Sequence, residues 1–299
     1  MSVLYTPNSL EKGLKAMFLQ YFSTEAALAP QIAHIESSDS DLESYEWLGQ
    51  APTMQEFLDE RRSMPMSNTK YSITNKTWES TITVSRSDLA DSKTGGVQRR
   101  IQQMAATAAG HQNKLLINAL IDGTSDLCYD GTAMFGNSHT ARADEGGVQD
   151  NLLAGTGTTT ATCAADIATA KATMLNFTNE AGEPFHGDGI GSLAVVCGPS
   201  LEKAFRETLN AGIISNTSNV QTGMADLIVS PRLSDADDWY LLRTDSARAL
   251  ILQDREPLEF SALEGASDSG FMRDQWVYGV RARYNIGYAF WQCAVKTVN

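Results

Sequence analysis

The first pattern along the chain is an apolar stripe with the 3.6-residue period of a helix. The stripe consists of Leu10, Leu14, Met17, Phe18, Tyr21 and Phe22. Residues 36–41, which follow, are too polar to contribute to a core. The sequence therefore predicts a short amphipathic helix on a polar tether, which buries its apolar face either on its own domain or on a neighbouring molecule.

Two segments rich in β-branched and aromatic residues come next. Residues 71–74 and 81–84 predict strands, and residues 53–62 predict either a short helix or an irregular turn. Large apolar residues are few between positions 45 and 85, so this region resembles a projecting two-stranded ribbon. Such a ribbon is only marginally stable in water, and we expect it to lie on a partner surface.

The strongest helical signal lies between Gly95 and Gly123. Its apolar positions are Val97, Ile101, Met104, Ala105, Ala108, Leu115, Ala119 and Leu120. At about 1.5 Å per residue this helix is on the order of 40 Å long, so it can serve as a structural spine. Residues 127–160 are rich in glycine and predict loops.

Helices and strands alternate in the second half of the chain. The predicted elements are helices at 164–176 and 200–209 and strands at 193–197, 226–230, 238–242 and 249–252. This alternation predicts a compact α/β domain. Residues 276–284 and 287–292 predict two further strands joined by a turn around Asn285, and we expect both to pair near the spine helix rather than in the α/β domain.

The composition indicates an acidic, well-folded protein. With 23 Lys+Arg against 36 Asp+Glu the formal net charge is −13, and 42% of the residues are hydrophobic. The sequence has neither a signal peptide nor an apolar run of about 20 residues, so we expect a soluble protein made in the cytoplasm, without a membrane segment. The acidity argues against binding nucleic acid through a positively charged surface.

The four cysteines, Cys128, Cys163, Cys197 and Cys293, are widely separated and form no C-x-x-C pair. Disulfides are rare in cytoplasmic proteins, and free cysteines commonly act as small core residues. We therefore expect four buried free thiols.

The histidines allow two hypothetical sites for which the sequence contains no supporting motif. These are a catalytic triad of Ser138, His186 and Asp188 and a metal site of His139, Asp144 and Glu145. No G-x-S-x-G elbow or i,i+4 histidine pair positions either group. We predict no catalytic, cofactor-binding or metal-binding residues.

Several blocks of the sequence resemble one protein family. The blocks are residues 45–50, 71–81, 127–131, 137–139, 278–283 and 291–292. In this order they resemble the major head subunit of Mu-like tailed phages, whose α+β fold is that of the Hong Kong 97 phage capsid. The resemblance spans nearly the whole chain, although residues 193–210 match only the general pattern of the capsid axial domain.

The resemblance implies a division of the chain into four parts. Residues 1–44 form an N-terminal arm with a short helix, and residues 45–90 form an extended β-hairpin loop. Residues 91–160 and 251–299 form a peripheral domain with the spine helix, and residues 161–250 form an α/β axial domain. By the same analogy the extended loop lies on an adjacent subunit.

The resemblance also implies a structural protein of the virion, assembled in the cytoplasm of a bacterial host. It forms hexamers and pentamers of an icosahedral head around double-stranded DNA, which it does not bind sequence-specifically. The expected partners are other copies of the chain, a separate scaffolding protein and a portal at one vertex; a cementing protein is left open. The predicted inter-subunit residues are Leu14, Phe18, Trp47, Phe57, Tyr71 and Trp78.

Two alternatives remain at this point. An encapsulin-like compartment shell has the same fold but encloses protein cargo, and the blocks described above disfavour it. A hydrolase that uses His139 or His186 is the other alternative.

Overall fold

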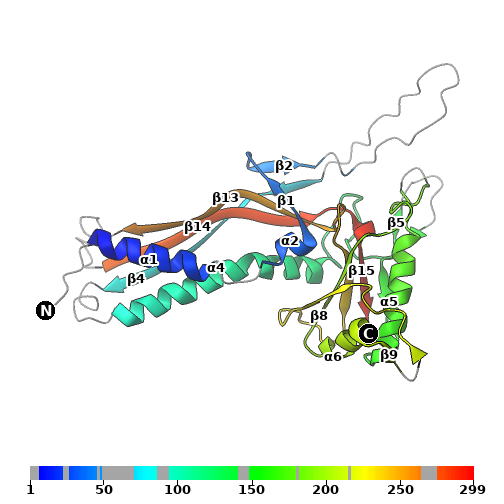
Figure 1. The fold of residues 1–299 in the computed structure, drawn as a ribbon. Coiled ribbons are helices and arrows are strands. Elements are labelled where there is room, and N and C mark those ends of the chain that lie inside the picture. The colour runs from blue at the N-terminus through cyan, green and yellow to red at the C-terminus, as the bar shows by residue number, and fades with distance from the viewer. Residues whose placement is uncertain are drawn as a thin grey trace, which may run out of the picture.

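The computed structural model describes residues 7–22, 27–45, 48, 71–85, 94–140, 148–179, 182–214, 217–263 and 275–299. In this part of the chain a long sheet runs beside helix α4 (Thr94–Asp122) (Figure 1). A smaller sheet lies at the end of the molecule opposite to the N-terminal end of α4. The predicted spine helix is thereby confirmed. Its residues Ile101 and Ala105, and again Leu116 and Leu120, are fully buried at the i,i+4 spacing of one helix face.

The long sheet has the strand order β1-β13-β14-β4. Its strands are β1 (Ala33–Ser37), β13 (Leu250–Leu263), β14 (Gln275–Tyr288) and β4 (Lys76–Ser85). Strand β1 is parallel to β13, and the other neighbours are antiparallel. Helix α1 (Pro7–Phe22) packs on the N-terminal half of α4 and on the adjacent end of this sheet (Figure 1).

The predicted turn at Asn285 is wrong. Strand β14 continues through it, because Asn285 pairs with Gln253 and Gly287 pairs with Ile251 in an unbroken register. A Cβ atom added to Gly287 would lie 2.4 Å from Cδ1 of Ile73. The glycine therefore permits close packing against a strand and does not mark a turn.

The described parts of the predicted ribbon pair with other strands of this chain. Strand β4 pairs along all ten of its residues with β14 of the same chain. Strand β3 (Ser72–Thr74) pairs with β2 (Leu42–Ser44), which lies in the segment that follows the predicted tether. Both predicted strands exist, and each pairs along one edge with a strand of the same chain. Residues 49–70 between them lie outside the described residues, so the contact of the ribbon with a partner surface stays a prediction.

The smaller sheet has the strand order β11-β8-β12-β15-β7. Its strands are β11 (Asp226–Val229), β8 (Leu193–Cys197), β12 (Trp239–Arg243), β15 (Ala294–Val298) and β7 (Leu152–Ala154). Helices α5 (Thr160–Leu175) and α6 (Glu202–Asn210) accompany it. All five residues of β8 are buried, as expected for a strand covered on both faces.

This sheet crosses the domain boundaries expected from the sequence. Strands β7 and β15 come from segments assigned to the peripheral domain, yet they pair with the α/β domain. Conversely, the strand predicted at 249–252 begins β13 of the long sheet. The expected pairing near the spine helix is therefore correct for β14, which includes residues 287 and 288 of the second predicted strand. Residues 291–293 form a 3-10 helix instead of a strand, and β15 was not predicted.

The remaining elements are short. They are α2 (Ala29–Ile32), β5 (His139–Thr140), β6 (Val148–Gln149), β9 (Ile213–Ile214), β10 (Thr217–Ser218) and the 3-10 helix η2 (Trp291–Cys293). All four cysteines are buried and free, as predicted.

Candidate functional site

The apolar face of α1 lies against its own chain. Leu14 and Phe18 are 2% and 0% exposed, and the Phe18 ring centroid lies 5.3 Å from that of Phe260 on β13. Of the two dockings left open by the sequence, the structure has the one within the chain. The outer face of α1 instead exposes Leu19 (50%) and Tyr21 (40%). Leu19 lies off the apolar stripe, so the stripe could not identify it as a surface residue available to a neighbour.

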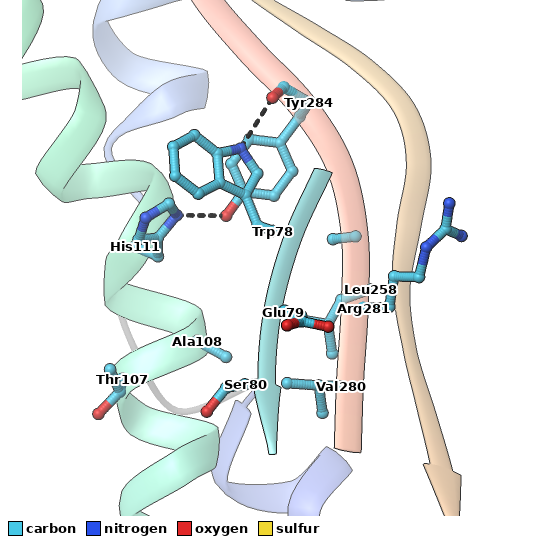
Figure 2. Close-up of a pocket in the computed structure, with 11 residues that line it drawn as sticks. Trp78, Glu79, Ser80, Thr107, Ala108, His111, Leu258, Val280, Arg281 and Tyr284 are labelled. Atoms are coloured by element: carbon cyan, nitrogen blue, oxygen red, sulfur yellow. Dashed lines mark hydrogen bonds between the residues drawn. The ribbon is translucent and has the colours of Figure 1, made fainter. Parts of the chain in front are cut away.

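Trp78 projects from β4 and lies between α4 and β14 (Figure 2). Its Nε1 donates a hydrogen bond of 2.9 Å to the backbone oxygen of Tyr284, and its ring centroid lies 4.5 Å from that of His111. His111 Nδ1 lies 2.7 Å from the Tyr284 hydroxyl. This half-buried side chain borders a pocket of about 200 Å³ whose wall includes Ala108 and Val280. Trp78 is thus already engaged within the subunit.

Tyr71 connects the β2-β3 pair to strand β14 through hydrogen bonds. Its hydroxyl accepts a hydrogen bond of 2.9 Å from the backbone N–H of Tyr288, and its backbone oxygen accepts one of 2.8 Å from Tyr45. Burial raises the pKa of the Tyr71 hydroxyl above its usual value. Trp47 and Phe57 lie outside the described residues, and the interface that the six predicted residues would form stays a prediction.

The triad drawn from the sequence is not assembled. His186 is 5% exposed, and its Nε2 lies 2.9 Å from the backbone oxygen of Gln292 while its Nδ1 lies 2.8 Å from Nη1 of Arg243. Both ring nitrogens are engaged, so neither can take a proton from Ser138. Ser138 and Asp188 are exposed loop residues.

His186 should make stability depend on pH. Burial lowers its pKa to about 4 from the usual 6.5, and the nearby Arg243 adds to the effect. Because the folded pKa is the lower one, the unfolded chain binds a proton at this ring between about pH 6.5 and 4 and the folded chain does not. The free energy of unfolding is therefore unaffected by this group above about pH 6.5, falls as the pH drops from there, and has lost the full contribution once the pH has passed through 4. His186→Gln, which can keep both hydrogen bonds, should lose less stability than the wild type between pH 6.5 and 4.

Urea denaturation of the unassembled chain at a series of pH values measures this difference. His34→Gln, at a half-exposed histidine, serves as the control and should follow the wild-type curve. Identical pH curves for wild type and His186→Gln would contradict the assignment.

A second polar cluster lies in the loop before β5. His139 Nδ1 is 2.6 Å from Oδ2 of Asp130, whose Oδ1 accepts hydrogen bonds from Cys128 Sγ and from the backbone N–H and hydroxyl of Thr132. Burial alone would raise the pKa of Asp130, but these bonds outweigh it and hold the pKa well below its usual range.

The metal site drawn from the sequence differs from this cluster. His139 was grouped there with Asp144 and Glu145, which lie outside the described residues. In the structure His139 meets Cys128 and Asp130 instead. In the sequence, the only sign of this cluster was Cys128 and Asp130 two positions apart on a turn that ends at Gly131.

Arginines of the long sheet hold the acidic segment before β2. Asp41 accepts hydrogen bonds from Arg255 at 3.1 Å and from Arg283 at 2.5 Å, and Glu256 bonds both Arg281 and Arg283. Nearby, Ser38 is buried and accepts a hydrogen bond of 2.8 Å from Nδ2 of Asn75. The segment is therefore attached to the body and does not act as a free tether.

Removing the Asp41 carboxylate should have a small, salt-dependent effect. The Asp41 side chain is 78% exposed, and exposed ion pairs contribute at most about 1 kcal/mol. We expect Asp41→Asn to lower the unfolding free energy by less than about 1 kcal/mol at low salt, and by less at high salt because the charges are screened. Asp39→Asn, which changes the net charge equally two residues away, is the matched control in urea denaturation. A salt-independent loss would exclude an electrostatic origin.

Comparisons with known proteins agree with this fold. The family model of the Mu-like prophage major head subunit gpT matches residues 8–162 and 234–299. The Mu-like prophage FluMu major head subunit of Haemophilus influenzae is 26% identical over 295 residues, covering 97% of this chain and 73% of that protein. The major capsid protein of Escherichia phage Mu is 27% identical over 299 residues, covering 98% and 74%.

Solved structures show the same architecture. The procapsid of bacteriophage JBD30 matches with a TM-score of 0.56 and 26% identity, over 99% of this chain and 76% of that chain. A virus-like particle from Pyrococcus furiosus matches with a TM-score of 0.60 over 98% and 100% of the two chains, but at 11% identity it shows the fold alone. These matches confirm the Hong Kong 97-like capsid fold predicted from the sequence. None of the helices in the described ranges combines the length and apolar character needed to cross a membrane. The match of the family model over most of the chain shows that the chain belongs to the family of Mu-like prophage major head subunits, gpT.

Proposed function

We propose that this chain builds the shell of a Mu-like phage head as hexamers and pentamers that enclose double-stranded DNA. The observation that carries the proposal is the gpT family match over residues 8–162 and 234–299, together with the capsid fold. An encapsulin-like shell shares the fold but not the family. The role is structural, and the engaged nitrogens of His186 support the absence of hydrolase chemistry at that residue.

The small hairpin of β9 and β10 supports a contact between copies at one end of the subunit. Ile213 is 69% exposed, and Val220, just after the hairpin, is 85% exposed. Exposed apolar side chains that lie close together commonly mark interaction surfaces. We propose that this hairpin meets its copies at a symmetry axis, with Trp47 and Phe57 contributing elsewhere.

The charge of the chain supports a passive role toward DNA. A net charge of −13 disfavours tight phosphate binding, so packaged DNA can slide along the shell. We propose a separate scaffolding protein and a portal at one vertex as further partners during assembly in the bacterial cytoplasm.

Negative-stain electron microscopy of the purified, expressed chain tests the proposal. Closed shells are the expected product. Ile213→Asp and Val220→Asp should reduce the yield of shells at least several-fold and leave the denaturation midpoint of the unassembled chain unchanged, because both side chains are exposed. Lys203→Ala, on α6 with its side chain 87% exposed, is the control and should assemble normally. A wild-type chain that stays monomeric with its scaffolding protein present would overturn the proposal, and normal assembly of both aspartate variants would exclude the hairpin contact.

A further inference from the structure

Three different metal-ligating side chains converge in the loop before β5. The ligand atoms of Cys128, Asp130 and His139 all lie within 4.8 Å of one another. Cys128 and His139 are 4% and 0% exposed, and the Asp130 side chain is 12% exposed.

The spacing of these atoms suits a single small ion. Zinc lies about 2.3 Å from sulfur and about 2.0–2.2 Å from nitrogen and oxygen ligands, so its ligand atoms are roughly 3–4 Å apart. Two pairs are now closer, at 2.6 Å (His139 Nδ1 to Asp130 Oδ2) and 2.9 Å (Cys128 Sγ to Asp130 Oδ1). Each of these pairs is joined by a hydrogen atom. An ion that replaces those hydrogen atoms needs to move the ligands by only about 1 Å.

The ligands are held in place by the surrounding fold. The Cys128 N–H bonds the Thr132 oxygen at 2.8 Å, and the Gly131 N–H bonds the Cys128 oxygen at 3.1 Å. Gly131 has φ +80°, a left-handed conformation that favours glycine. The His139 ring stacks on Trp291 with centroids 4.2 Å apart and planes 12° apart. Such a site does not have to be ordered by the metal, which favours binding.

We propose that Cys128 Sγ, a carboxylate oxygen of Asp130 and His139 Nδ1 bind one Zn²⁺ ion. A mixed sulfur, nitrogen and oxygen set suits zinc, and the two negative ligands neutralise its charge. A water molecule held by the Thr132 hydroxyl, which lies 2.9 Å from His139 Nδ1, completes four ligands.

Binding moves two protons. The thiol of Cys128, whose pKa burial raises well above its usual value, releases its proton to solvent. The proton on Nδ1 of His139 transfers to Nε2, a buried nitrogen that has no hydrogen-bond partner among the described residues. The ion then links residues 128–132 to strand β5, which should stabilise this part of the subunit.

Metal analysis of the full-length chain tests the proposal. After treatment with a chelator and dialysis against Zn²⁺, wild type should retain about one zinc per chain and unfold at a higher temperature than the metal-free chain. Co²⁺ added in place of zinc should give the charge-transfer absorption of a thiolate ligand. Zinc affinity should fall on the order of 100-fold or more in Cys128→Ser and in His139→Gln.

Controls separate this site from other causes. Cys163→Ser changes another buried cysteine and should keep both the zinc and the thiolate absorption. The serine hydroxyl in Cys128→Ser can still donate a hydrogen bond to Asp130, so the metal-free variant should still fold. The Co²⁺ spectrum of the wild type tests the thiolate ligand without any variant. Co²⁺ bound without thiolate absorption, or zinc far below one per chain, would overturn the proposal and identify the cluster as a hydrogen-bonded loop anchor. Neither result bears on whether the chain forms shells.

Discussion

Trp78→Ala should destabilise the unassembled chain by about 3 kcal/mol. The substitution removes the hydrogen bond to Tyr284 and the ring contact with His111, and it enlarges the neighbouring pocket of about 200 Å³. Removing a large aromatic side chain from a packed site typically costs about 3–5 kcal/mol, and the partial exposure of Trp78 puts it at the lower end. Urea denaturation of the unassembled chain measures the loss.

Trp78→Phe is the matched variant. It keeps an aromatic ring beside His111 but loses the hydrogen bond, so the expected loss is about 1 kcal/mol. From the sequence, Trp78 was expected to contact a neighbouring subunit. In that case Trp78→Ala would reduce shell yield and leave the unassembled chain as stable as wild type, which is the outcome that would contradict the packing described here.

Phe18→Ala should release helix α1 from the body of the subunit. Phe18 is fully buried, 5.3 Å from the ring of Phe260 and 6.0 Å from that of Phe22. Loss of about 3 kcal/mol of packing should speed the exchange of the α1 amide hydrogens by roughly two orders of magnitude, because exchange reports the local opening free energy. Hydrogen exchange by mass spectrometry on the unassembled chain measures this.

In the unassembled chain, the exchange rates of α1 distinguish docking within one chain from docking on a neighbour. If α1 docks within its own chain, the acceleration occurs in free subunits and does not depend on protein concentration. Leu19→Ala, one position further and 50% exposed, should leave the exchange rates nearly unchanged. Equal, fast exchange of α1 in wild type and Phe18→Ala would show that the helix is bound only when a neighbour is present.

Elements with a strong local pattern could be predicted from the sequence. Helix α4 and strand β8 follow from an apolar period and from a short run of buried residues, and both signals lie within one segment. Strand β1 could not be predicted, because His34, Glu36 and Ser37 give it a polar sequence. It is a strand because its backbone pairs with residues 250–254 of β13. Pairing with a distant strand overrides local propensity.

The surroundings of single side chains were the least predictable. Trp78 was a reasonable interface candidate from a segment with few large apolar residues, yet its hydrogen bond joins positions 206 residues apart. No local pattern encodes such a contact. His139 was grouped with acidic residues that follow it, whereas the turn at Gly131 brings Asp130 from nine positions before it.

The order of strands in the smaller sheet also sets when the subunit can be completed during synthesis. Strand β15 lies between β12 and β7, and β7 has no other neighbour in that sheet. Residues 152–154 therefore cannot pair in this sheet until residues 294–298 have been synthesised. At about 5–20 residues per second, the ribosome reaches β15 roughly seven to thirty seconds after β7. Strand β12 is made late in that interval, about 50 residues before β15, so its edge is open for roughly three to ten seconds, and nascent chains on one messenger can pair through it. A subunit closed by β15 has lost that edge, so a complete chain can no longer pair with another chain in this way.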